Sequence, residues 1–341
     1  MEVSMKLNFF KAAKIVLALV LVSSTFLGCQ GGPKKMVIGL SLPTQREARW
    51  VSDKLTMEAY AKGLAVELKI AVADADMAQQ TAQCENLLTQ GIDVLILAPH
   101  DGSAAAPLVE KAHEEGVKVI SYDRLILNAD VDLYISFDNV KVGELQGEFI
   151  TKAVPKGNYI IMSGAPTDNN AKLFKQGAMK FIQPLIDSGN IHVVVDQGVE
   201  NWLPTNALNI VENALTASKN KVDAILAPND GTAGGAIVAL TAQGLAGKVA
   251  ITGQDAEGAA AKRIVQGIQS MTIFKDTREL GKAAIDAAIA FASRKAPIIN
   301  GQVNNGKIDV TANLLTPYVV TKDNLDALLI DSGYLKKAEV Y

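Results

Sequence analysis

The sequence carries one strand-to-helix turn twice. The first copy reads LILAPHDGSAA at residues 95–105, and the second reads AILAPNDGTAG at 224–234. In each half a further apolar run follows the turn and ends at an aspartate, Asp123 in the first half and Asp255 in the second. Local turn chemistry alone could place Pro, Asn or Asp and Gly after two unrelated strands. The shared LAP-x-DG string favours the other interpretation, two equivalent βαβ halves that face each other across a cleft.

Short apolar runs alternate with helical patterns along the chain, which is typical of parallel sheets covered by helices. In the first half we expect strands over 36–42, 65–73, 93–99, 117–123 and 132–138. In the second half we expect them over 158–164, 192–198, 223–229, 249–255 and 269–275. The tail is predicted to hold a helix over 277–296 and one more strand over 314–324, before a final short helix.

With 341 residues the chain is long enough for two domains. The predicted fold class is α/β, with two similar Rossmann-like lobes that each contain a parallel sheet and are joined by a hinge of several strands. We assign residues 36–138 plus 276–305 to the N-terminal lobe. Residues 139–275 plus 306–341 are assigned to the C-terminal lobe.

The N-terminal residues differ in character from the rest of the chain. Lysines precede the apolar run IVLALVLVSSTFLG, which is too short for a membrane span but typical of a secretory signal. Residues 1–29 are therefore interpreted as a signal peptide with a lipobox-like end at Cys29, and 30–35 as a flexible tether. The alternative is an ordinary signal in which Cys29 is incidental. Either way the protein is expected outside the cytoplasm, and Cys84 is expected to be a buried apolar residue rather than half of a disulfide.

Composition and motifs exclude several classes of function. The net charge of −3 gives no basic surface for nucleic acid. The sequence contains no dinucleotide or P-loop glycine motif, no GxSxG, no HExxH and no metal-spaced Cys/His cluster, so we expect no cofactor, no metal site and no enzyme. Asp123 and Asp255 could form a glycosidase pair, but beside Arg124 and Lys275 they are better interpreted as ionised hydroxyl acceptors.

Ligands of open α/β sheets bind beyond the carboxyl ends of the strands, so the polar and aromatic residues that follow each run are the candidates for a binding site. The candidate ligand-binding residues are Arg49, Trp50, Asp123, Arg124, Asp168, Asn170, Trp202, Asn229, Asp255 and Lys275. Arg46 and His100 also follow strands but are less clearly part of the site. Carboxylates, amides and guanidinium groups suit vicinal hydroxyls, and tryptophan offers a flat apolar surface to a sugar ring. The mixture predicts a site for a monosaccharide.

Several strings resemble the periplasmic sugar-binding proteins of ABC importers, which have the type I periplasmic binding protein fold. They are ARW at 48–50, YDR at 122–124, YISFDNVKVGELQG, DNNAKLF, WLPTNAL, NDGTAGGAI and GQDAE. The resemblance covers roughly residues 36–335 and implies D-xylose as the ligand. It implies that Arg49 and Arg124 donate to sugar oxygens and that Asp123 and Asp255 accept from hydroxyls. Asp168 and Asn170, Asn229 and Lys275 match further polar contacts of the family, and Trp50 and Trp202 match its stacking residues.

The expected function is capture of a monosaccharide by a monomeric protein that closes over it and docks on a membrane permease. His100 stands where the family more often has an aromatic or other polar residue, so selectivity between xylose and similar aldoses stays open. Three rival functions stay open. A sensor that feeds a membrane receptor would use the same ligand chemistry, and an exported sugar-active enzyme would need a poised nucleophile or acid. A sugar-responsive regulator would need a helix-turn-helix where this chain has its signal segment.

Overall fold

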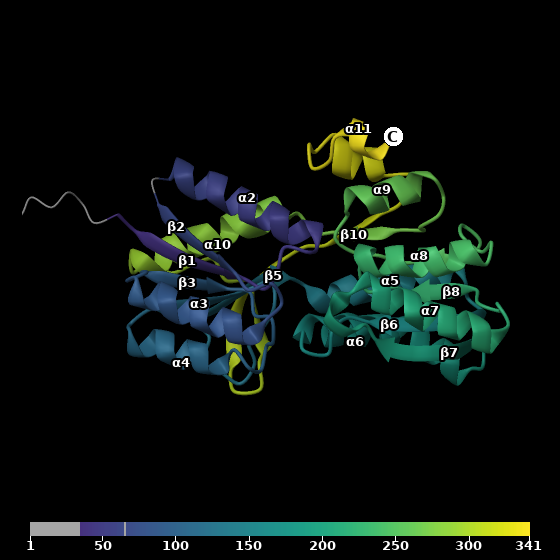
Figure 1. Ribbon diagram of the computed structural model, residues 1–341, viewed down its shortest axis with the longest axis horizontal. Coiled ribbons are helices and arrows are strands. Elements are labelled where there is room, and N and C mark those ends of the chain that lie inside the picture. The colour runs from purple at the N-terminus through teal and green to yellow at the C-terminus, as the bar shows by residue number, and fades with distance from the viewer. Residues whose placement is uncertain (1–34, 65) are drawn as a thin grey trace, which may run out of the picture. The chain divides into compact units, whose positions relative to one another are not determined.

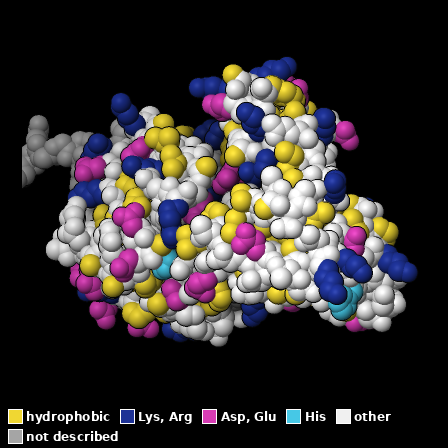
Figure 2. Space-filling model, turned by 45° about the vertical axis from the view of Figure 1, so that its right-hand side comes forward, with side chains coloured by type: hydrophobic (Ala, Val, Ile, Leu, Met, Phe, Trp, Pro, Cys, Tyr) yellow, Lys and Arg dark blue, Asp and Glu magenta, His cyan; other side chains and the backbone are white. Residues whose placement is uncertain are grey.

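The computed structural model describes residues 35–64 and 66–341, and residues 36–341 form one compact unit. The predicted signal peptide and Cys29 lie outside the described residues. The unit contains two helix-covered sheets, each built on parallel strands, and so confirms the predicted α/β class (Figure 1). Figure 2 shows acidic and basic side chains interspersed over the face that it presents.

The first sheet has seven strands in the order β11-β12-β5-β4-β3-β1-β2. Its strands are β1 (Val37–Leu42), β2 (Glu67–Val72), β3 (Val94–Leu97), β4 (Lys118–Tyr122), β5 (Leu133–Phe137), β11 (Gly301–Asn304) and β12 (Asp309–Leu315). Helices α2 (Ala48–Gly63) and α10 (Thr277–Ala292) cover one face, and α3 (Met77–Thr89) and α4 (Ala106–Glu114) cover the other (Figure 1). The strands are parallel except for β11, which pairs antiparallel with β12.

The second sheet has four parallel strands in the order β7-β6-β8-β9. Its strands are β6 (Gly157–Ser163), β7 (Ile191–Gly198), β8 (Ala224–Leu226) and β9 (Ala250–Ile251). The core on one face contains side chains of α7 (Pro204–Ser218) and α8 (Asp230–Ala242), and the core on the other contains side chains of α5 (Asn139–Ala153) and α6 (Asn169–Asp187). A separate antiparallel pair joins β10 (Thr272–Phe274) to β13 (Tyr318–Val320). The remaining elements are α9 (Gly258–Val265), α11 (Lys337–Val340) and the short turns η1 (Glu200–Trp202) and η2 (Asp326–Ile330).

The tail differs from the sequence prediction. Instead of one strand over 314–324 there are two, because Pro317 separates β12 from β13 and proline cannot continue the backbone ladder. Since β12 pairs with β5, residues 309–315 belong to the first sheet rather than to the second lobe, where 306–341 had been placed. The chain thus passes between the lobes three times, after β5, after β10 and after β12.

Candidate ligand-binding site

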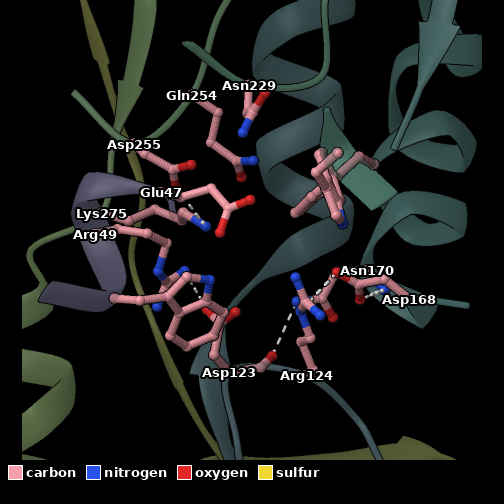
Figure 3. Close-up of a pocket in the computed structure, with 13 residues that line it drawn as sticks. Glu47, Arg49, Asp123, Arg124, Asp168, Asn170, Asn229, Gln254, Asp255 and Lys275 are labelled. Carbon is pink, nitrogen blue, oxygen red and sulfur yellow. Dashed lines mark hydrogen bonds and ion pairs between the residues drawn. The ribbon is translucent and has the colours of Figure 1, made fainter. Parts of the chain in front are cut away.

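One pocket is lined by residues of both lobes (Figure 3). The structure brings all the predicted ligand-binding residues together in its wall, and adds three that the sequence analysis missed. The lining residues are Glu47, Arg49, Trp50, Asp123, Arg124, Asp168, Asn170, Phe174, Trp202, Asn229, Gln254, Asp255 and Lys275. A pocket lined by so many charged and amide side chains suits a polar molecule.

Asp123 and Asp255, the aspartates that end the repeated units, have equivalent backbone geometry. Their φ angles are +59° and +96°, in the region that side-chain-bearing residues rarely occupy. The backbone N–H of Asp123 donates to the carbonyl of Ile135 at 2.7 Å, and that of Asp255 donates to the carbonyl of Ile273 at 2.8 Å. Each hydrogen bond reaches a following strand and holds the unusual turn in place. The two matched turns place both carboxylates in the wall of the pocket.

Arg49, in the first turn of α2, bridges two carboxylates of the first lobe. Its Nη1 lies 2.6 Å from Asp123 Oδ1, while its Nε and Nη2 lie 3.2 and 3.0 Å from Asp53 Oδ2. The Tyr122 hydroxyl also donates to Asp53. Burial acts to raise the pKa of Asp123, but the charges of Arg49, Lys275 and Arg124 outweigh it, so this pKa falls below its usual value. Asp123 is therefore an ionised acceptor, fixed in position by a guanidinium.

Two more ion pairs lie in the pocket wall. Arg124 Nε, from the first lobe, lies 2.9 Å from Asp168 Oδ2 of the second lobe. Lys275 Nζ lies 3.0 Å from Asp255 Oδ1. Burial raises the pKa of Asp168, and Arg124 offsets that rise only in part. Asn170 adds a second link between the lobes, because its Nδ2 donates to the backbone carbonyl of Asp123 at 2.9 Å.

The two tryptophans lie in different surroundings. The Trp50 ring is flanked by guanidinium groups, with the Cζ atoms of Arg49 and Arg124 at 4.3 and 5.3 Å from its centroid. The Trp202 ring meets Phe174 edge to face at 6.5 Å. Gly164 makes room for it, since a Cβ there would lie 2.0 Å from the ring. Trp50 is thus held by cation–π contacts and Trp202 by packing, and both offer apolar surface to the pocket.

The missed residues, Glu47, Phe174 and Gln254, left only weak signals in the sequence. Gln254 and Phe174 stand inside the strings GQDAE and DNNAKLF, and Glu47 stands between Arg46 and Arg49 in the segment after the first strand. Glu47 Oε2, Gln254 Oε1, Trp202 Nε1 and Asp255 Oδ1 are buried without a hydrogen-bond partner among the described residues, the last despite its ion pair with Lys275. Buried polar atoms are normally paired, so the atoms of Glu47, Gln254 and Trp202 are free to accept or donate a hydrogen bond from within the pocket.

Arg46 and His100 line a second, adjoining pocket rather than the main one. Burial, followed by the nearby charges of Arg124 and Arg46, lowers the pKa of His100. Cys84 is buried, as predicted, and burial raises the pKa of its thiol to about 11. Within residues 35–64 and 66–341 there is no group of three or more His, Cys, Asp or Glu able to hold a metal, and no helix long and apolar enough to cross a membrane.

The arrangement is suited to holding a polyhydroxylated molecule. Cationic donors, carboxylates and amides line the wall together with aromatic rings. Of the described residues that line the pocket, none is Ser, Cys or His. The carboxylates Asp123, Asp168 and Asp255 each lie in an ion pair, which suits acceptance of hydroxyl hydrogens.

Comparisons with known proteins agree with this chemistry. A family model described as "Periplasmic binding protein domain" matches residues 38–296. The chain is 47% identical over 307 residues to the D-xylose-binding periplasmic protein of Escherichia coli, covering 90% of this chain and 93% of that protein. It is 48% identical to the protein of the same name in Haemophilus influenzae, with the same coverage. A multiple sugar-binding periplasmic receptor of Rhizobium radiobacter is 38% identical, over 89% of this chain and 91% of that receptor.

Solved structures are similar over the same range. A carbohydrate transporter solute-binding protein of Chloroflexus aurantiacus in complex with D-glucose matches with a TM-score of 0.86 and 37% identity, covering 90% of this chain and 98% of that one. An ABC transporter solute-binding protein of Clostridium phytofermentans with bound β-D-glucose matches with a TM-score of 0.84 and 34% identity, covering 89% and 100%.

Proposed function

The chain belongs to the periplasmic binding protein family, and from that premise we propose that it captures a monosaccharide, D-xylose first among them, and delivers it to an ABC importer. The observation that carries this proposal is the pocket itself. Both lobes contribute charged and polar groups to it, and three buried polar atoms, Glu47 Oε2, Gln254 Oε1 and Trp202 Nε1, lack partners among the described residues. A small polyol would supply the missing hydrogen bonds.

The proposed roles follow from the charges of the side chains. Arg49, Arg124 and Lys275 donate to sugar oxygens. The acceptors of hydroxyl hydrogens are Asp123 and Asp255, one from each lobe. Asp168, Asn170 and Asn229 make the remaining polar contacts, and the rings of Trp50 and Trp202 contact the C–H faces of the sugar. No bond is made or broken in this scheme, so the proposed function includes no catalysis.

Capture is coupled to closure of the lobes. The sugar meets the residues of both lobes only when the lobes are together, so it binds the closed state better and shifts the population toward it. Micromolar affinity requires about −8 kcal/mol. Hydrogen bonds to charged groups contribute about 1.5–3 kcal/mol each. Several such bonds together can supply a net binding free energy of this size after the entropic cost of ordering the sugar and the lobes is subtracted.

We also propose that the protein works outside the cytoplasm as a monomer, held at a membrane through a lipid on Cys29. The support is the N-terminal sequence, with its short apolar run before the cysteine, and the periplasmic relatives. Metabolic labelling with a fatty acid tests the anchor. Label is expected in the natural chain and lost in Cys29→Ala, and equal labelling of the two would contradict it.

Calorimetric titration of residues 30–341 with xylose, ribose, glucose, galactose and arabinose tests the function. We expect one-to-one binding of xylose that weakens at least about tenfold in Asp255→Ala, because this change removes an acceptor and leaves the buried Lys275 without its carboxylate. The matched control is Asp323→Ala at an exposed position, where affinity should not change. Absence of binding to every sugar by the natural sequence would contradict the proposal.

A further inference from the structure

Glu47 lies in the first lobe immediately before α2, and its carboxylate points across the main pocket. Figure 3 shows the side chain between Gln254 and Lys275, which belong to the second lobe. Its Oε2 is buried and has no hydrogen-bond partner in the part of the chain that the structure describes. A buried carboxylate oxygen without a partner is costly unless a ligand group meets it.

Glu47 also lines the second pocket, whose other residues are Thr44, Arg46, His100, Arg124, Ala165, Thr167, Asn201 and Trp202. Of these, Arg124 and Trp202 are shared with the main pocket as well. Glu47, Arg124 and Trp202 therefore form the partition between the two adjoining pockets. The ion pair with Asp168 holds Arg124 in place, and the ring contact with Phe174 holds Trp202. Glu47 is therefore the partition residue whose side chain can move most easily.

We propose that Glu47 determines the size class of sugar that the site accepts, an inference that rests on the proposed function. Its carboxylate accepts a hydroxyl hydrogen of a bound pentose and, in the same position, closes the main pocket against the second one. A hexopyranose carries one hydroxymethyl group more than a pentopyranose. The second pocket has polar groups that could receive it, among them Thr44, Thr167 and Asn201.

Three substitutions of Glu47 separate its hydrogen bond to the sugar from its closing of the main pocket against the second one. Glu47→Gln keeps the size of the side chain and removes its charge. Glu47→Asp keeps the charge and shortens the side chain by one methylene, and Glu47→Ala removes both functions. Glu58→Ala is the matched control, because it deletes the same charge from an exposed position on α2. Affinities for xylose and glucose are measured by calorimetry on the protein from residue 30 onward, and thermal unfolding shows which variants fold.

For Glu47→Gln we expect xylose to bind about tenfold more weakly, as for loss of one charged hydrogen bond. In Glu47→Asp and Glu47→Ala the ratio of glucose to xylose affinity should rise about tenfold, the usual effect of one carbon group in a pocket. The control should match the natural sequence in both quantities. An unchanged ratio in the shortened variants that fold would overturn the inference while leaving the proposed function intact. A natural sequence that binds neither sugar would overturn both.

Discussion

Asp53 does not line the pocket, but its hydrogen bonds orient the side chain of Arg49, which does. The two residues are four apart on α2, so their side chains lie on one face of the helix, and Asp53 Oδ2 receives both Nε and Nη2 of Arg49. Asp53 is fully buried. Burial raises its pKa to about 6, although Arg49 and the Tyr122 hydroxyl act to lower it.

The raised pKa of Asp53 makes stability depend on pH in a direction opposite to most carboxylates. Between its ordinary value and about 6, the folded protein binds the Asp53 proton more tightly than the unfolded chain does, so this group's contribution to stability falls as pH rises. Asp53→Asn removes the titration. We expect the free energy of unfolding of the natural sequence, relative to the variant, to fall by roughly 1–3 kcal/mol from pH 4 to pH 6.5. Urea unfolding of both proteins at both pH values measures the difference in unfolding free energy. A difference that stays the same at the two pH values would contradict the prediction.

At the scale of residues, the sequence predicted the site because of one geometric rule. Parallel strands end at the same edge of a sheet, so Asp123, Arg124 and Asp255 could be grouped without knowing any distance. Glu47 follows the first strand just as Arg46 and Arg49 do, so the same rule could have included it. The left-handed backbone conformation of Asp123 and Asp255 could not be predicted either, because an aspartate in the sequence does not by itself indicate it.

Helices α5 and α6 of the second lobe pack almost backbone to backbone. A Cβ on Gly143 would lie 1.9 Å from the carbonyl oxygen of Phe174, and a Cβ on Gly177 would lie 2.1 Å from that of Val140. This contact matters for the site, because α6 carries both Asn170 and Phe174. The close approach of two helices therefore positions part of the pocket wall.

Gly143→Ala should force α5 and α6 apart. We expect a loss of about 2–4 kcal/mol of unfolding free energy, as for a buried clash that cannot relax onto a flexible side chain. Sugar affinity should weaken with it, because Asn170 moves with α6. Gly63→Ala is the control, since a Cβ at the end of α2 meets nothing within 4 Å and alanine favours the helix. Thermal or urea unfolding of both variants decides it, and equal stability would contradict the packing argument.

The positions of the strands were predictable from periodicity, but their lengths were not. The run predicted over 249–255 contains only the two-residue strand β9. After Ile251, the side chain of Thr252 bonds to the residue that follows β8. Its hydroxyl accepts a hydrogen bond from the Ala227 N–H and donates one to the Ala227 carbonyl, both at 2.8 Å. A side chain that replaces a backbone ladder leaves the apolar pattern unchanged, so no sequence pattern marks the end of the strand.

At the scale of the whole structure described from residue 36 onward, direct bonds hold the lobes closed. Arg124 pairs with Asp168, Asn170 donates to the backbone of Asp123, and the Gly102 N–H donates to the Thr167 carbonyl at 3.1 Å. The three passages of the chain between lobes are the expected hinge. The last of them was placed wrongly because sequence order does not reveal that β12 returns to the first sheet.

One carboxyl titrates in the physiological range and crosses the interface between the lobes. Glu257, in the second lobe, accepts a hydrogen bond from the backbone of Ala48 in the first. Burial raises its pKa to about 7, with Asp255 and Glu47 adding to the rise and Arg263 and the Ala48 hydrogen bond opposing it. Asp230, whose own pKa burial raises well above its usual value, lies beneath and accepts from the Glu257 N–H. Opening would remove Ala48 and Glu47 from its surroundings and expose it to water.

Closure should therefore take up a proton. Because the pKa of Glu257 is higher in the closed state than in an open one, closure and sugar affinity are favoured at low pH and weaken as pH rises toward 7. We expect xylose to bind several-fold more tightly at pH 5.5 than at pH 8, with little change above pH 8. Glu257→Gln should bind with nearly the same affinity at both values, whereas Glu212→Gln, at an exposed position on α7, should keep the dependence. Calorimetry in two buffers of different ionisation enthalpy also counts the protons taken up, and a natural sequence that takes up none at pH 6.5 would contradict the coupling.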